Sequence, residues 1–245
     1  MLHFETIRYA RRRALLRPPA RQRSGGLILK RVAVLIDGGH LRIAAQTARV
    51  KYEPDLIEKV AVACVANGED LFRAFYYDCP LFNGTRKLPV SGADQVFRGD
   101  NEWLNVLASK ELFAIRLGTL KFRGYKPKKS KFLGRPLADA DFKPDFEQKG
   151  VDMRIGLDIA NFCVTKAVDR IVLITNDTDC VPAMKYGRRA ELQVVLMSLP
   201  GQTTAPELLH HVDIKRQLKE WPKSAKRNAS LTTPATPPQA VGPSA

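Results

Sequence analysis

Five short apolar segments, separated by stretches of helical character, place the strongest constraint on how this chain can fold. They are VAVLI (32–36), LFRAFYYD (71–78), LFAIRLGTL (112–120), RIVLIT (170–175) and LQVVLM (192–197). Because they are apolar at most positions rather than at every second one, they are typical of strands buried on both faces. Such strands, separated by helices, predict an α/β fold in which a five-stranded parallel sheet is covered by helices on both sides.

The segments between the strands carry the helical pattern. A basic insertion, residues 121–149, separates the third strand from the helix that follows it. Helices are expected over 41–47, 54–66, about 93–109, about 151–165, about 178–189 and 207–218. In folds of this type, ligands bind beyond the carboxyl ends of the strands, where the strand order reverses.

Carboxylates occur where two of these strands end and where one helix begins. Asp37 closes the first strand, and Asp177 and Asp179 follow the fourth. Asp152 lies in the first turn of the helix that leads into the fourth strand, and Asp158 lies six residues further on. Because that helix runs antiparallel to its strand, its N-terminus lies at the same edge of the sheet. The pattern therefore predicts a carboxylate cluster that holds Mg²⁺ or Mn²⁺, which prefer oxygen ligands.

Each of these carboxylates also has a structural interpretation. Asp37 and Asp179 are of the residue type that caps a following helix, and Asp152 would be stabilised by the helix dipole. Asp158 lies about 240° around the helix from Asp152. It can share an ion with Asp152 only if the helix points end-on at the site. Two further polar residues, Thr175 and Asn176, are expected to orient the carboxylates.

The net charge of +15 is concentrated in three segments. Residues 1–31, 110–150 and 214–228 hold most of the excess Lys and Arg, and the rest of the chain is slightly acidic. Basic attachments around an acidic centre suit a polyanion that is held at its edges. No apolar run approaches the ~18 residues of a membrane span. We therefore expect no membrane association.

The basic insertion interleaves Lys and Arg with aromatic residues, as in LKFRGYKPKKSKFLGRP. Cations of this kind neutralise phosphates, and Phe122, Tyr125 and Phe132 could stack on unpaired bases. The alternatives are a solvated loop or a dimerisation arm, which would make the protein a homodimer. The residues expected to bind RNA are Lys121, Arg123, Tyr125, Lys126, Lys128, Lys129 and Lys131.

The termini differ in composition from the middle of the chain. Residues 1–30 are Arg-rich and acid-poor, which fits organellar targeting, a nucleic-acid-binding arm or a start codon placed too far upstream. Residues 221–245 are Pro/Thr-rich and expected to be disordered. The folded domain is therefore expected over 31–220. The four widely spaced cysteines fit free thiols in a reducing compartment, so we expect a cytoplasmic protein.

Four segments, in this order and spacing, resemble the NYN-domain proteins of the PIN-like nuclease superfamily. They are VAVLIDGGHL, FYYDCP, QKGVDMRIGLDIA and IVLITNDTDCVPAM. The resemblance covers roughly residues 31–215 and implies a three-layer α/β/α sandwich with strand order 3-2-1-4-5. That order would place Asp37 beside Asp177. The KGVD match supports Asp152, and the implied activity is metal-dependent cleavage of RNA.

One position departs from the family pattern, since the chain has Gly39-His40 where an Asn is usual soon after the first-strand Asp. His40 either replaces the missing polar group or marks a weakened site.

From the carboxylate pattern and the resemblance together, we expect a ribonuclease that hydrolyses single-stranded RNA with one or two bound metal ions. The expected catalytic residues are Asp37, Asp152, Asp177 and Asp179, and Asp158 is expected to be an additional metal ligand. The alternatives are an RNA-binding or regulatory module with a degenerate site, and a phosphatase for small phosphoesters. A small substrate would not need the extended basic surface.

Overall fold

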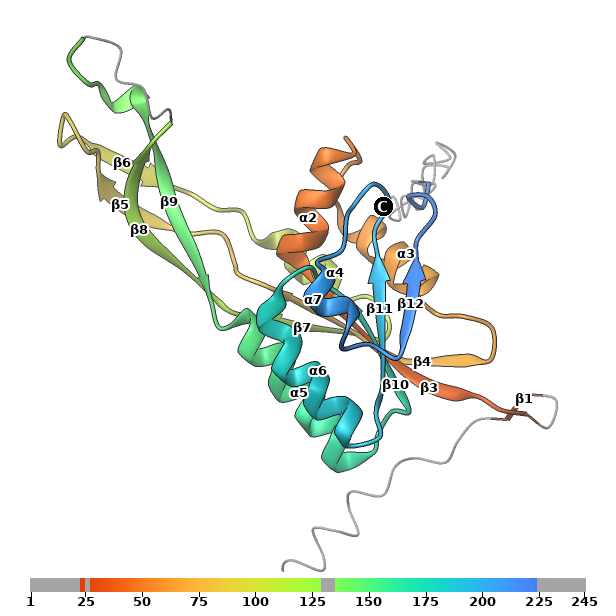
Figure 1. Ribbon diagram of the computed structural model, residues 1–245. Helices are drawn as coiled ribbons and strands as arrows, with labels where there is room; N and C mark the ends of the chain where they lie inside the picture. Colours follow the sequence, from red (N-terminus) through yellow and green to blue (C-terminus); the bar gives the residue numbers. More distant parts are fainter. Residues whose placement is uncertain (1–22, 25–26, 129–134, 224–245) are drawn as a thin grey trace, which may run out of the picture.

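A six-stranded parallel sheet with the order β12-β11-β10-β3-β4-β7 forms the centre of the protein (Figure 1). The computed structural model describes residues 23–24, 27–128 and 135–223. When these strands are numbered in chain order, the first five lie side by side in the sheet in the order 3-2-1-4-5. The predicted α/β class and strand order are therefore confirmed, and a sixth strand extends the sheet. The strands are β3 (Lys30–Asp37), β4 (Glu69–Asp78), β7 (Phe113–Leu117), β10 (Arg170–Ile174), β11 (Gln193–Ser198) and β12 (Ile214–Gln217).

Helices cover both faces of the sheet and bury two separate apolar cores (Figure 1). The first core packs α2 (Gly38–Thr47), α3 (Pro54–Ala63) and α4 (Glu102–Ala108) against one face. The second packs α5 (Val151–Thr165), α6 (Val181–Arg189) and the short α7 (Pro206–Leu209) against the other. None of the helices within the described residues is both long and apolar enough to cross a bilayer.

The strand β3 shows why the segments are continuously apolar. Val32, Val34 and Ile36 belong to the first core, and Ala33 and Leu35 belong to the second. All five are fully buried, because alternate side chains of a strand point to opposite faces of the sheet. The strand pairs with β10 as far as Ile36–Ile174, so both strands end at the same edge of the sheet.

The expected helix over 207–218 is wrong. Only α7 is helical there, and the chain continues as the edge strand β12. Its side chains alternate between half-buried and exposed, and Ile214 packs on the first core. Arg216 forms an ion pair with Glu69 of β4, which also pairs with Arg170 of β10. The period-two alternation and this tertiary pairing outweigh the local helical pattern.

The expected helix over 93–109 is also partly wrong, because only α4 is helical. The residues before it form a hairpin of β5 (Gly84–Lys87) and β6 (Asp94–Phe97). The basic insertion forms a second hairpin of β8 (Thr119–Pro127) and β9 (Phe142–Lys149), and a 3-10 turn, η1 (Asp139–Asp141), precedes β9. The two hairpins lie together and project from the body as an arm (Figure 1). A further short antiparallel pair, β1 (Arg23–Ser24) with β2 (Leu27–Ile28), precedes β3.

Aromatic side chains from both hairpins pack together as the core of the arm. Phe82, Phe97, Phe122 and Phe146 have ring centroids 5.4–6.0 Å apart. Tyr125 packs on Phe122 and donates a hydrogen bond to Gln95 of β6. The rings of Phe122 and Tyr125 therefore help to hold the two hairpins together, and their stacking on bases stays a prediction. The third aromatic of the insertion, Phe132, lies outside the described residues.

Candidate metal centre

The ends of β3 and β10 are tied together by Thr175. Its hydroxyl donates to Asp37 Oδ2 at 2.9 Å and accepts from the backbone N–H of Asp177 at 3.1 Å. Thr175 is 3% exposed, so this bridge is held within the sheet edge. The other oxygen of Asp37, Oδ1, accepts from the backbone N–H of His40 and caps α2. The expected orienting contact of Thr175 is therefore present in the structure.

Three carboxylates meet at this edge. Asp152, from the first turn of α5, lies with Asp177 and Asp179, and one carboxylate oxygen of each lies within 4.8 Å of the others. Asp177 follows β10 and caps the short 3-10 helix η2 (Thr178–Cys180) by accepting from the backbone N–H of Asp179. The cap is thus Asp177 rather than Asp179, whose exposed carboxylate is left to face the cluster.

Two of the residues expected at the site lie elsewhere. Asp158 accepts from the Tyr77 hydroxyl and forms an ion pair with Arg116, because six residues of helix carry it about 9 Å beyond Asp152 and round to another side. Asn176 bonds the backbone of Thr203 and Ala205 and so holds the loop before α7, not the carboxylates.

The electrostatic environment of the cluster raises the pKa of two carboxyl groups. Burial is the main cause for Asp152, and the negative charges of Asp177, Asp37 and Asp179 raise its pKa further. Burial also raises the pKa of Asp37, and the hydrogen bonds from His40 and Thr175 oppose this only in part. Negative charge is therefore crowded at this edge of the sheet, and a cation would relieve the repulsion.

The nearby cysteine does not offer a nucleophile. Cys180 is buried beneath the carboxylates, and burial together with the charges of Asp152 and Asp177 raises its pKa to about 12. The thiol is therefore protonated and unreactive at neutral pH. All four cysteines are buried free thiols, as the sequence predicted.

His40 stands at the position where the chain departs from the family pattern. Its backbone N–H binds Asp37, and burial lowers the pKa of its imidazole although the charge of Asp37 opposes this. The contact with Asp37 thus comes from the backbone of residue 40, which any residue except proline provides.

A buried polar network beside the site was missed by the sequence analysis. Asp78, at the end of β4, is fully buried and accepts hydrogen bonds from Arg42, Tyr76, Gln148 and the backbone N–H of Cys79. The signal was present, because Asp78 closes an apolar strand as Asp37 does. A β-carbon at Gly38 would lie 2.3 Å from the Tyr76 hydroxyl, so only glycine fits where α2 begins against this network.

The basic residues of the insertion are partly neutralised within the arm. Arg123 pairs with Glu147, and Lys126 pairs with Asp145 across the β8–β9 ladder. Lys121 and Lys128 are exposed on the same hairpin. The remaining two predicted RNA-binding lysines, Lys129 and Lys131, lie outside the described residues.

The donor set fits a hard divalent cation. Three carboxylates from two chain segments converge within the span of one ion's ligand shell, with no nitrogen or sulfur ligand among them. Oxygen-only sets of this kind are typical of Mg²⁺ and Mn²⁺ sites that leave positions for water and phosphate. The residues that could hold an ion are therefore Asp152, Asp177 and Asp179, with Asp37 adjacent.

A parallel α/β sheet with acidic residues at its carboxyl edge is the architecture expected of the PIN-like nuclease superfamily. The NYN domain model matches residues 31–216 of this chain, which therefore belongs to the NYN domain family. The structure is also similar to the crystal structure of VPA0982, a protein of unknown function from Vibrio parahaemolyticus RIMD 2210633, with 16% identity and a TM-score of 0.47. That alignment covers 81% of this chain and 98% of the other. Comparison with curated proteins gives no match.

Proposed function

We propose that this protein is a metal-dependent ribonuclease that hydrolyses phosphodiester bonds in single-stranded RNA. The observation that carries the proposal is the convergence of Asp152, Asp177 and Asp179 at the carboxyl edge of an NYN-domain sheet. The buried free cysteines support a reducing, cytoplasmic environment.

The residues of the chain have distinct parts in this proposal. Asp152, Asp177 and Asp179 would hold Mg²⁺ or Mn²⁺, and Asp37 adds negative charge beside them. Thr175 fixes the position of Asp37 relative to the backbone of Asp177. A bound ion of this type supplies polarisation of the phosphate and lowers the pKa of an attacking water.

The basic surfaces support a nucleic-acid substrate rather than a small phosphoester. The net charge is +15 although the carboxyl edge of the sheet is acidic. We propose that exposed cations of the hairpin of β8 and β9, including Lys121 and Lys128, contact phosphates away from the scissile bond. Such contacts stabilise substrate and transition state alike, so they contribute affinity and not turnover.

The test is incubation of the purified protein with end-labelled single-stranded RNA in Mn²⁺ or in EDTA. We expect cleavage in Mn²⁺, none in EDTA, and recovery when excess Mn²⁺ is added back. The control is the Asp177→Asn protein from the same purification, which detects a contaminating nuclease. RNA binding without cleavage under any divalent cation would instead favour the RNA-binding module, for which the unusual His40 position is the supporting observation.

A further inference from the structure

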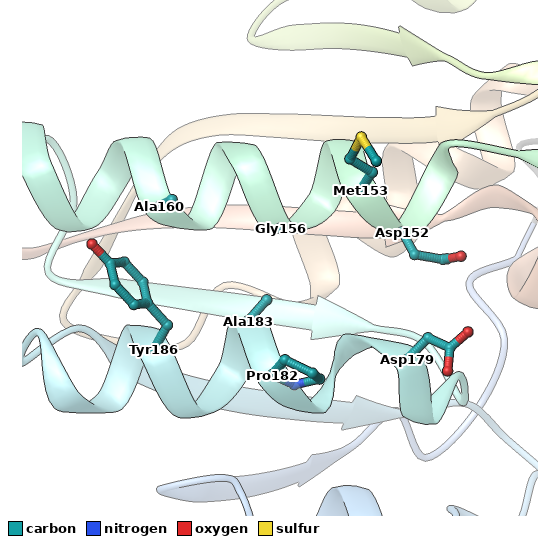
Figure 2. Close-up of a pocket in the computed structure, with 8 residues that line it drawn as sticks. All are labelled: Asp152, Met153, Gly156, Ala160, Asp179, Pro182, Ala183 and Tyr186. Carbon is teal, nitrogen blue, oxygen red and sulfur yellow. The ribbon is translucent and has the colours of Figure 1, made fainter.

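An apolar groove between α5 and α6 opens directly onto the carboxylates (Figure 2). Its volume is about 440 Å³, within the range of ligand-binding clefts. Asp152 and Asp179 stand at one end, and both belong to the candidate metal centre. The ring of Tyr186 rises from α6 opposite Ala160 of α5, toward the other end (Figure 2). The groove and the metal centre are therefore one continuous surface.

Small residues shape the floor of the groove. Gly156 on α5 faces Ala183 on α6, and a β-carbon at Gly156 would lie 3.7 Å from the Ala183 methyl group. Because these positions carry little or no side chain, the two helices pack closely here and leave a shallow floor on which a flat group could lie. Tyr186 is 49% exposed, so a large part of its ring is available for contact with such a group.

The flank of α6 beside the groove is basic. Lys185 lies one turn beyond Pro182, and Arg189 lies one turn beyond Tyr186, so both cations border the residues that line the groove. Lys185 and Arg189 are exposed, and they line a second cavity together with Arg188 and Asp213, which form an ion pair with each other. Moving along α6 from the carboxylates, the surface therefore changes from acidic to apolar with a cationic border.

We infer that this groove binds the unpaired nucleobase of a nucleotide close to the scissile phosphate of a single-stranded RNA, with Tyr186 stacking on the base. The apolar groove suits the face of a base, since stacking on an aromatic ring tolerates any base. The cations on the flank of α6 suit the phosphates that follow the bound base along the RNA. The carboxylates at the end of the groove suit the reacting phosphate together with its metal ion. An apolar peptide segment or a lipid chain would match the apolar groove. It would not match the carboxylates at the end of the groove or the cations at its border.

This inference rests on the proposed function, which places the reacting phosphate at the carboxylates. A measurement of RNA binding tests the inference without any cleavage of the RNA. The probe is a fluorescent ten-nucleotide oligouridylate in Ca²⁺, together with versions in which one base at a time is replaced by an abasic spacer. Tyr186→Ala is expected to weaken binding of the intact RNA at least about fivefold. Tyr186→Phe, which keeps the ring, is expected to bind as the wild type does.

The abasic series then identifies the contact. In the wild type, removal of one particular base should weaken binding, and the same removal should have no further effect in Tyr186→Ala. The control is Val62→Ala, which shortens a similarly exposed apolar side chain on α3, against the opposite face of the sheet. The inference is overturned if the Tyr186→Ala protein binds the intact RNA as tightly as the Val62→Ala protein does. It is also overturned if each abasic replacement lowers RNA affinity by the same factor in Tyr186→Ala as in the wild type. Failure of the proposed ribonuclease activity can be distinguished from failure of this inference. The RNA would then stay intact in Mn²⁺, whatever the binding measurements show.

Discussion

Replacing Asp152 or Asp177 with asparagine is expected to lower the rate of RNA cleavage at least about a hundredfold, the scale of losing one preorganised electrostatic contact to the transition state. Asparagine keeps the size of the side chain but removes a charge needed to hold a divalent cation. The fold should persist, because an asparagine that replaces Asp177 can still cap η2. The measurement is initial cleavage rate in Mn²⁺ at saturating RNA.

The stability of the same variants gives an independent readout. The pKa of Asp152 is raised in the folded protein, so above that pKa its ionised form opposes folding. Asp152→Asn should therefore melt at a higher temperature than the wild type at pH 7 without metal, and should lose the stabilisation that Mn²⁺ gives the wild type. The matched control is Asp158→Asn on the same helix, which should cleave RNA normally because Asp158 pairs with Arg116. Wild-type cleavage by Asp152→Asn and Asp177→Asn would place the chemistry elsewhere.

Replacing Asp78 with asparagine is expected to lower the free energy of unfolding by about 3 kcal/mol, because it breaks a buried, hydrogen-bonded ion pair. Asp78 is fully buried, and Arg42 donates to both of its oxygens, at 2.5 and 3.3 Å. An amide has only one accepting oxygen and no charge, so the guanidinium of Arg42 would lose its paired carboxylate. Urea denaturation followed by tryptophan fluorescence measures the effect.

The control for this substitution is Asp70→Asn, the same change at the partly exposed start of the same strand. It is expected to alter the free energy of unfolding by less than about 0.5 kcal/mol. Equal effects of the two substitutions would show that the Asp78 network contributes little to stability. The network also joins Gln148 of the arm to β4, so Asp78→Asn should loosen the base of the arm.

The sequence predicted the body of the fold well because its strands are buried on both faces. Continuous apolar runs such as 32–36 and 170–175 have few alternatives to a central parallel strand. The arm and β12 were harder to predict, because their strands are largely half-exposed or exposed. Their conformation depends on pairing with residues distant in sequence, such as Phe82 with Phe146 and Glu69 with Arg216. Those contacts have no local signature.

The candidate site divides in the same way. Asp37, Asp177 and Asp152 could be placed together because topology brings strand ends and one helix N-terminus to a common edge. The orientation of each side chain could not, so Asp158 and Asn176 were grouped with residues they do not contact. The groove lined by Tyr186 was not foreseen, because a tyrosine on an amphipathic helix has no distinguishing pattern before α5 and α6 are packed.

The most direct measurement of the central hypothesis is an anomalous difference map from crystals soaked in Mn²⁺. We expect a peak about 2 Å from carboxylate oxygens of Asp152 and Asp177, with Asp179 facing the same ion and the peak absent from Asp152→Asn crystals. If the protein cleaves RNA in Mn²⁺ but its crystals bind Mn²⁺ only away from these carboxylates, the proposed metal centre is wrong.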